Sequence, residues 1–231
     1  MRTILITGGS KGIGEGIVTR YLEEGDYVIN IDILEPSKSN QPNYKYIACD
    51  IADEKALNQV LSNIEHHIDI IILNAATFDQ SPFLNQSITD IKTVINTNLV
   101  GHIQIAQDYA KRFKGNHGRI IVLSSTRAVM SEKNTIGYTV SKGGLSSLVH
   151  GLAVTLKEKD ITVNGIAPGW INSHDDDLRD IDHDFHLSNR VGKVEDIIKG
   201  VLFLTDPSND FINGEIITID GGVTRKMMYP E

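Results

Sequence analysis

Hydrophobic residues occur along the chain in short continuous runs that alternate with amphipathic stretches. Runs of this length with few polar positions are typical of strands buried on both faces. They cover Thr3–Ile6, Tyr27–Ile31, Lys45–Cys49, Ile68–Leu73, Arg119–Leu123, Ile161–Ile166 and Glu215–Ile219. The stretches between them show helical periodicity over Gly12–Gly25, Ile88–Phe113, Tyr138–Lys159 and Val194–Leu204.

This alternation of strands and helices predicts crossover connections and a parallel sheet with helices on both faces. We expect an α/β fold, a single doubly wound, Rossmann-type domain over residues 1–231 with about seven strands. A ligand of such a sheet binds at the carboxyl edge of the strands. The Pro-, Ser- and Asn-rich segment Glu35–Asn43 is too short to separate domains and is predicted to be a surface loop.

Composition narrows the class of partner. The formal net charge is −8, which disfavours nucleic acid and anionic membranes as partners. No stretch approaches the ~20 apolar residues of a membrane span, and the first residues do not resemble a signal peptide. Cys49 is the single cysteine, so no intrachain disulfide can form. We therefore expect a cytoplasmic protein with a small-molecule substrate.

A glycine-rich turn joins the first strand to the first helix. Gly8, Gly12 and Gly14 allow a tight turn, and the following helix N-terminus offers free N–H groups to a phosphate. The spacing is G-x-x-x-G-x-G, which is neither the G-x-G-x-x-G fingerprint nor a P-loop. Taken alone, the turn is equally compatible with a plain strand–helix connection.

Asp32 ends the second apolar run, eighteen positions after Gly14. A carboxylate there can accept hydrogen bonds from the adenosine ribose and repels a 2′-phosphate, which favours NAD over NADP. Lys11 favours NADP instead, because a cation in the turn attracts the additional 2′-phosphate. An ordinary turn aspartate would also occupy this position.

Tyr138 and Lys142 lie four residues apart and share one face of the predicted helix. A tyrosine has a pKa of about 10, and a nearby ammonium lowers it, so the pair is suited to general acid–base chemistry. Ser125 follows the fifth strand at the carboxyl edge, and Asn98 lies in a helix after the fourth. Each residue also has a purely structural alternative. Tyr138 and Lys142 could be a packed tyrosine beside a solvated lysine, and Ser125 could cap a helix or turn. Asn98 could be a helical asparagine hydrogen-bonded to a neighbour.

Together these motifs resemble the short-chain dehydrogenase/reductase family over nearly the whole chain. They occur in the family's order, with thirteen positions from Ser125 to Tyr138, and Asp220-Gly221-Gly222 after the last strand. The resemblance implies a catalytic set of Asn98, Ser125, Tyr138 and Lys142. It also implies a cofactor-binding set of Gly8, Ser10, Lys11, Gly12, Ile13, Gly14, Asp32, Asp50, Ile51, Asn74, Ala75, Ala76, Tyr138, Lys142, Pro168, Gly169, Ile171 and Ser173.

The resemblance also implies roles for the catalytic set. Ser125 binds the substrate oxygen, and Tyr138 exchanges a proton with the alcohol or ketone. Lys142 lowers the pKa of Tyr138 and binds the nicotinamide ribose, and Asn98 holds a water that connects Lys142 to solvent. The chain departs from the family pattern where Ala76 replaces a glycine and Leu73 an asparagine, and Ser173 stands where a threonine is common.

Residues 171–190 fall where the family has its substrate lid. This segment contains His174, Asp175, Asp176, Asp177, Asp180, Asp182, His183, Asp184 and His186. A metal site and a solvated acidic loop are both compatible with this composition, and the loop is favoured because the spacing fits no metal motif. We predict no metal site. Such a loop would disfavour anionic substrates and an acidic carrier protein.

The function predicted from these residues is NAD-dependent hydride transfer between a nicotinamide and a secondary alcohol or ketone. One alternative is a 3-oxoacyl thioester (acyl-carrier-protein) reductase, which would prefer NADPH. An alternative of another class is a catalytically weak nucleotide-binding regulatory protein, or a purely structural module. The resemblance further implies a homo-oligomer, either a tetramer or a dimer.

Overall fold

A parallel sheet of seven strands forms the centre of the computed structural model, which describes residues 1–37, 41–115, 117–173 and 176–227. The strand order is β3-β2-β1-β4-β5-β6-β9. The strands are β1 (Thr3–Thr7), β2 (Tyr27–Asp32), β3 (Tyr44–Ala48), β4 (Ile70–Leu73), β5 (Gly118–Leu123), β6 (Ile161–Pro168) and β9 (Ile216–Ile219). The predicted doubly wound α/β fold is confirmed, and the order reverses between β1 and β4.

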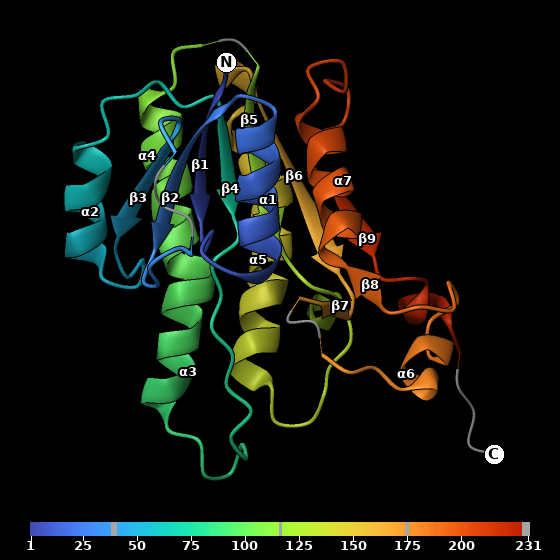
Figure 1. The fold of residues 1–231 in the computed structure, drawn as a ribbon. Helices are drawn as coiled ribbons and strands as arrows, with labels where there is room; N and C mark the ends of the chain where they lie inside the picture. The colour runs from blue at the N-terminus through green and yellow to red at the C-terminus, as the bar shows by residue number, and fades with distance from the viewer. Residues whose placement is uncertain (38–40, 116, 174–175, 228–231) are drawn as a thin grey trace.

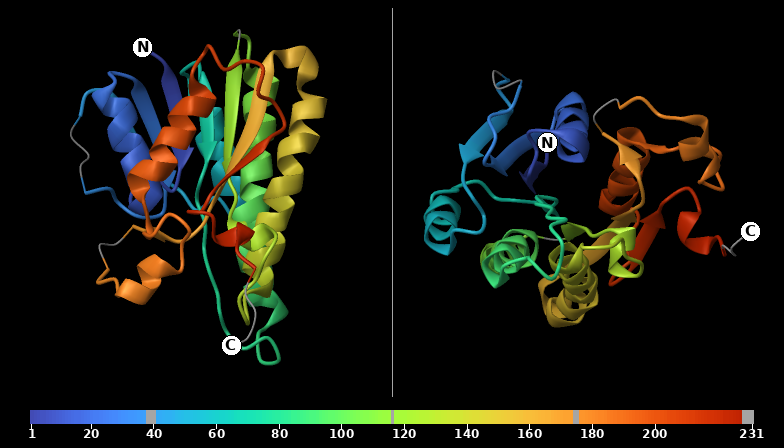
Figure 2. Two further views of the ribbon diagram at one scale, coloured as in Figure 1. Left: turned by 90° about the vertical axis from the view of Figure 1, so that its right-hand side faces the viewer. Right: turned by 90° about the horizontal axis from the view of Figure 1, so that it is seen from below.

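Helices cover both faces of the sheet (Figure 1). They are α1 (Gly12–Glu23), α2 (Glu54–Ser62), α3 (Ile88–Ile95), α4 (Gly101–Arg112), α5 (Ile136–Thr155), α6 (Asp180–Asp184) and α7 (Val194–Thr205). Seen from below, α1 and α7 lie on one face, and α2, α4 and α5 on the other (Figure 2). Each face has its own apolar core, because buried strands send alternate side chains to opposite sides.

The helices refine the predicted ranges. The periodic stretch Ile88–Phe113, which was compatible with more than one helix, contains α3 and α4 with a π-helical segment, Asn96–Val100, between them. Helix α2 was not predicted, because its nine residues carry only a short apolar stripe that is buried at Leu57 and Leu61. Its start is nevertheless encoded locally, since the carboxylate of Asp53 accepts hydrogen bonds from the first free N–H groups of the helix.

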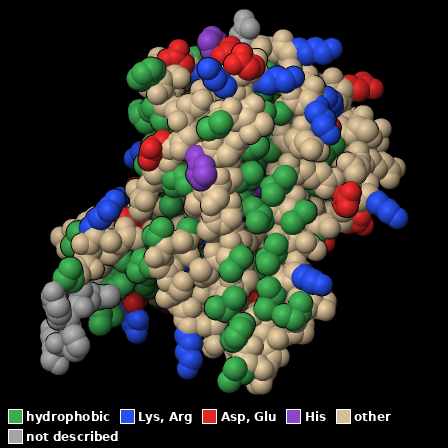
Figure 3. Space-filling model, turned by 180° about the vertical axis from the view of Figure 1, so that it is seen from behind, with side chains coloured by type: hydrophobic (Ala, Val, Ile, Leu, Met, Phe, Trp, Pro, Cys, Tyr) green, Lys and Arg blue, Asp and Glu red, His purple; other side chains and the backbone are tan. Residues whose placement is uncertain are grey.

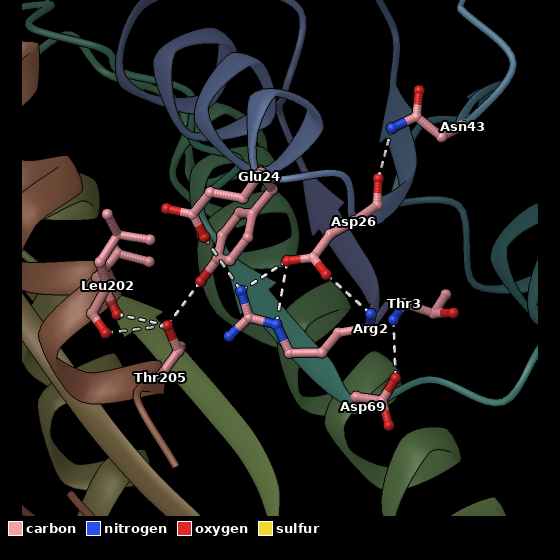
Figure 4. Close-up of polar contacts among 10 residues, drawn as sticks. Arg2, Thr3, Glu24, Asp26, Asn43, Asp69, Leu202 and Thr205 are labelled. Carbon is pink, nitrogen blue, oxygen red and sulfur yellow. Dashed lines mark hydrogen bonds and ion pairs between the residues drawn. The ribbon is translucent and has the colours of Figure 1, made fainter. Parts of the chain in front are cut away.

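The amino edge of the sheet is held by polar side chains. Arg2 donates to the carboxylate of Asp26 from Nε and Nη2 at 3.0 and 2.6 Å, and Asp69 accepts from the backbone of Thr3 at 2.7 Å (Figure 4). These bonds tie the starts of β1, β2 and β4 together. The amino ends of these strands are therefore held together by side chains, whereas the loops and the expected ligand site lie at the carboxyl ends.

At the carboxyl edge, the chain after β6 forms a small separate unit. Two-residue strands, β7 (Ile171–Asn172) and β8 (Gly192–Lys193), pair in parallel, and α6 lies between them in the sequence. Figure 1 shows this unit below the sheet, on the same side as the loops after β1, β4 and β5. No helix in the described ranges combines the length and apolarity needed to cross a bilayer.

Candidate active site

The glycine-rich loop after β1 is packed so closely that side chains are excluded at two positions. Gly8 has a positive φ of 68°, and a Cβ there would lie 2.8 Å from Cα of Ala75. A Cβ on Gly14 would lie 2.0 Å from the carbonyl oxygen of Gly8. The first turn of α1 therefore presses against the loop and turns its free N–H groups toward the carboxyl edge, where an anionic group can bind.

Asp32 lies at the end of β2 and holds this loop in place. Its carboxylate accepts hydrogen bonds from the backbone N–H of Ser10 at 2.9 Å and of Leu34 at 3.0 Å. Ser10 is itself buried and donates its hydroxyl to the Leu34 carbonyl. Asp32 is thus a turn residue, but each carboxylate oxygen keeps a lone pair for a further donor. The structural and the ligand-binding interpretations of Asp32 are compatible.

Asn74 joins the end of β4 to the same loop. Its side-chain amide donates to the carbonyls of Thr7 and Gly8 at 3.0 and 2.9 Å. Where the family pattern has a glycine, this chain has Ala76. Its φ is not positive, so the backbone at this position does not require a glycine. The departure from the family pattern therefore leaves the local backbone intact.

A cleft of about 720 Å³ runs along the carboxyl edge across the point where the strand order reverses. This volume lies in the range of cofactor and substrate sites, ~300–1,000 Å³. The sequence-predicted residues that line it are Gly8, Lys11, Gly12, Ile13, Gly14, Asp32, Asp50, Ile51, Asn74, Ala75, Ala76, Ser125, Tyr138, Lys142, Pro168, Gly169, Ile171 and Ser173. Ser10 and Asn98 are buried behind the lining.

Ser125 and Tyr138 face each other where the cleft passes the end of β5. The Ser125 hydroxyl accepts a hydrogen bond from the backbone N–H of Arg127 at 3.1 Å, so it caps a short turn, and it lies close enough to Tyr138 to lower the pKa of that residue. The adjacent Ser124 has a different function, because its hydroxyl donates to the Lys142 carbonyl inside the fold. Ser125 is therefore a cap that also lines the cleft, and its role toward a ligand stays a prediction.

Lys142 lies one helical turn after Tyr138 and is buried, with Nζ 5.4 Å from the centre of the tyrosine ring. Its ammonium donates to the carbonyl of Leu123 at 2.8 Å, and burial lowers the pKa of Lys142 to about 8. Burial also raises the pKa of Tyr138, while the hydrogen bond from Ser125 and the charge of Arg127 offset part of that rise. Arg127 is therefore a cation beside Tyr138 that the sequence did not point to, and the role of Lys142 toward Tyr138 stays a prediction.

Asn98 lies in the π-helical segment and is completely buried. Its side chain accepts from the Thr77 N–H at 2.7 Å, and donates to the Thr77 carbonyl at 2.9 Å and to the Ser141 hydroxyl at 3.1 Å. Asn98 thereby fixes the backbone at Thr77, which lines the cleft. Its side chain supports the wall of the cleft from behind.

His102 connects this segment to the cofactor loop. Thr7 Oγ1 already accepts the N–H groups of Asn74 and Ala75, so its own hydrogen points to His102 Nε2 at 3.1 Å. The other ring nitrogen must then carry the hydrogen, which it donates to the Asn98 carbonyl at 3.0 Å. Burial, followed by the charge of Lys142, lowers the pKa of His102 to about 3, in agreement with this neutral form.

The cleft also contains residues that the sequence did not single out. They are Ile31, Ile33, Leu34, Cys49, Thr77, Phe78, Thr93, Thr97, Leu123, Ser124 and Arg127. Arg127 is the one with a charge. It could have been noticed because it follows Ser125 by two positions, but only the fold shows that its guanidinium carbon lies 5.7 Å from the Tyr138 ring centre.

The acidic segment between β7 and β8 does not turn its described carboxylates into the cleft. Among the described residues of the segment 171–190, only Ile171 and Ser173 line it. Asp182 is paired with Arg179 at 2.6 Å, and His174 and Asp175 lie outside the described residues. The described part of the chain holds no group of three or more side chains able to bind a metal. We expected the acidic residues of this segment to repel anionic substrates, but none of its described carboxylates lines the cleft.

Comparison with known proteins agrees with this geometry. Residues 8–224 match a family model described as enoyl-(acyl carrier protein) reductase. An uncharacterized oxidoreductase of Thermotoga maritima is 34% identical over 252 residues, covering 100% of this chain and 98% of the relative. The chain belongs to the short-chain dehydrogenase/reductase family. It is an oxidoreductase with a nucleotide-binding Rossmann fold.

More distant members of the family have named activities. The 3-oxoacyl-[acyl-carrier-protein] reductase MabA of Mycobacterium tuberculosis is 27% identical, covering 96% of this chain and 92% of the relative. A solved structure of 4-hydroxyisoleucine dehydrogenase complexed with NADH is 27% identical with a TM-score of 0.91, covering 98% of this chain and 100% of that one. These relatives support a nicotinamide cofactor for the short-chain dehydrogenase/reductase described here.

Proposed function

We propose that this protein is an NAD(H)-dependent dehydrogenase or ketoreductase acting on a secondary alcohol or ketone. The observation that carries the proposal is the joining of two sites in one cleft. Ser125, Tyr138 and Lys142 lie at one part of the cleft, and the glycine loop with Asp32 at the other. This is the arrangement needed to bind a dinucleotide with its nicotinamide end at an acid–base group.

The residues fit the cofactor. The loop after β1 and the first turn of α1, which have no side chains at Gly8 and Gly14, would receive the pyrophosphate, and Asp32 would accept hydrogen bonds from the adenosine ribose. The remaining predicted contacts, from Asp50 to Ser173, lie along the same lining. When bound, the nicotinamide accepts or supplies the hydride.

The protein residues then handle the proton and the substrate oxygen. Ser125 donates a hydrogen bond to that oxygen and stabilises the charge that develops on it. During oxidation Tyr138 takes the hydroxyl proton as hydride leaves the carbinol carbon, and during reduction it returns that proton. Lys142 would hold the nicotinamide ribose, and Asn98 keeps the Thr77 backbone in place. We further propose that the segment 171–190 acts as the substrate lid.

The preference for NAD rests on Asp32. A 2′-phosphate placed beside this carboxylate is repelled, and the two backbone donors it already binds hold it in place. The NADH complex of the related 4-hydroxyisoleucine dehydrogenase supports the same preference. The reductases among the relatives support the alternative, a 3-oxoacyl-carrier-protein reductase. The presence of Ser125, Tyr138 and Lys142 together argues against a regulatory protein without catalysis.

The cofactor preference can be tested with the substitution Asp32→Asn. It removes the charge and keeps an oxygen acceptor for one of the two backbone donors. We expect wild-type enzyme to use NAD⁺ better than NADP⁺ across a panel of alcohols and hydroxyacyl thioesters. In the variant, the ratio of kcat/KM for NAD⁺ over NADP⁺ should fall about tenfold because the repulsion of the 2′-phosphate is lost. This fall corresponds to roughly 1.4 kcal/mol of discrimination between the two cofactors. Better use of NADPH with acyl thioesters by the wild type would instead favour the alternative.

We also propose a homo-oligomer. Figure 3 shows hydrophobic side chains gathered on the face behind the sheet, where α4 and α5 lie. Val100, Ile103, Val140 and Val154 are exposed there. Such a patch is typical of a protein–protein interface. Light scattering should give a mass of two or four times 25.5 kDa.

A further inference from the structure

Arg127 places a cation in the cleft beside the residues proposed to react. Its guanidinium carbon lies 5.0 Å from the ring centre of Phe78 and 5.7 Å from that of Tyr138. These two rings contact each other edge to face, with centres 5.1 Å apart. The guanidinium is therefore held against two aromatic rings.

The backbone fixes the position of this arginine relative to Ser125. Arg127 lies in the short turn Thr126–Ala128, whose first N–H groups are capped by Ser125. The Ala128 N–H also donates to the Ser125 carbonyl at 3.0 Å. Ser125 and Arg127 consequently belong to one turn beside Tyr138.

The guanidinium has donors left for a ligand. Among the described residues, its side chain pairs only with Glu132, through Nη2. Glu132 is 56% exposed and does not line the cleft, so this ion pair is screened by solvent and weak. Glu132 uses one of the two Nη2 hydrogens, so the other remains together with Nε and Nη1. A guanidinium binds a planar carboxylate through two parallel hydrogen bonds, from Nη2 and one of these two neighbours.

No carboxylate competes at this end of the cleft within the described ranges. The carboxylates that line it are Asp32, the last residue of β2, and Asp50, which follows β3, and both belong to the proposed nucleotide end. The lining also has hydroxyl and aromatic groups, among them Thr77, Thr97 and Phe78, and Phe78 contacts Arg127. The local charge facing a substrate is positive although the whole chain has a net charge of −8.

We propose that Arg127 binds the carboxylate of the substrate, so that the enzyme acts on a small hydroxy acid or the corresponding oxo acid. This inference rests on the proposed function. The acid lies with its carbinol oxygen at Ser125 and Tyr138, its short carbon chain against Phe78, and its carboxylate on Arg127. Oxidation transfers hydride from the carbinol carbon to NAD⁺ and the hydroxyl proton to Tyr138, giving the oxo acid, NADH and a proton.

The test compares 3-hydroxy and 4-hydroxy carboxylates of four to six carbons with their methyl esters. The ratio of kcat/KM for acid over ester isolates the carboxylate contact, because any effect of Arg127 on Tyr138 acts on both substrates. We expect this ratio to exceed one in wild-type enzyme and to fall about 10- to 100-fold in Arg127→Gln, the loss typical of a charge-assisted pair. Arg127→Lys should keep part of it.

Two further variants separate this role from a structural one. Lys133→Gln removes a cation from the same loop but outside the cleft, and should leave the ratio unchanged. Glu132→Gln releases the guanidinium from its surface partner and should raise the ratio up to about fivefold. If Arg127 only braced the loop, Glu132→Gln would instead impair acid and ester equally.

Binding measured without turnover distinguishes failure of this inference from failure of the proposed function. Butyrate and butyramide are added to enzyme with NADH, and the shift in melting temperature is recorded. We expect a shift with butyrate that disappears in Arg127→Gln, and none with butyramide, whether or not any alcohol is oxidised. Turnover with an acid-to-ester ratio near one, or butyrate binding unchanged in Arg127→Gln, would overturn the carboxylate role and leave the dehydrogenase intact.

Discussion

At the scale of single residues, the site depends on buried polar groups with fixed protonation. His102 is the clearest case, since its two ring nitrogens have opposite roles toward Thr7 and Asn98. Protonation of Nε2 would place a hydrogen against the hydrogen of the Thr7 hydroxyl and break that bond. The neutral imidazole is therefore part of the folded structure.

A pH dependence of stability follows from this imidazole. Its pKa is about 3 in the folded protein and about 6.5 when unfolded, so between these values the unfolded state binds a proton that the folded state does not. The free energy of unfolding should fall as the pH drops from 6.5 toward 3, by up to ~1.4 kcal/mol per pH unit from this group.

The substitution His102→Gln removes that contribution. Urea denaturation at pH 7, 6, 5 and 4 should show a shallower loss of stability in the variant than in the wild type, because all other titrating groups are shared. Two curves that stay parallel over this range would show that His102 takes up its proton in the folded protein.

At the scale of elements, the break between α3 and α4 positions one wall of the cleft. A continuous α-helix would give Asn98 a different direction, whereas the π-helical segment lets its side chain bind both backbone groups of Thr77. π-Helical turns inside helices are frequent at functional sites. Here the π-helical turn departs from regular α-helix geometry, and Asn98 thereby fixes the loop after β4 at Thr77.

Removal of that side chain should affect stability and catalysis together. Asn98→Ala leaves the N–H and carbonyl of Thr77 without these partners, which we expect to lower the free energy of unfolding by ~1–3 kcal/mol and to reduce kcat. Ser141→Ala is the matched control, since it removes one acceptor of Asn98 and leaves Thr77 bonded. Equal effects of the two substitutions in urea denaturation and in kcat would contradict a special role for the Thr77 contact.

At the scale of the whole molecule, the fold and most of the cleft were predictable. Continuous apolar runs such as Ile70–Leu73 can only be buried in a covered parallel sheet, and that sheet brings Asp32, Ser125 and the glycine loop to one edge. These positions depend on strand ends, which the sequence marks.

The remainder depends on contacts that no local pattern marks. The sequence could not show that Arg127 lies over the Tyr138 ring, because that depends on how the turn after β5 packs against α5. Nor could it show that Lys142 is bonded to the Leu123 carbonyl, or that the acidic carboxylates described beyond β7 turn away from the cleft. Each of these facts changes the electrostatics of the site and leaves the fold the same.

The most direct test of the central claim is a comparison of Tyr138→Phe with wild-type enzyme. Turnover with NAD⁺ is followed by the absorbance of NADH, and the dissociation constant of NADH is measured separately. The proposed proton transfer predicts that kcat/KM falls about 10²- to 10⁴-fold, the usual contribution of a general acid or base, while NADH binding changes less than about twofold. Normal turnover by the variant would contradict the role of Tyr138 and with it the proposed mechanism.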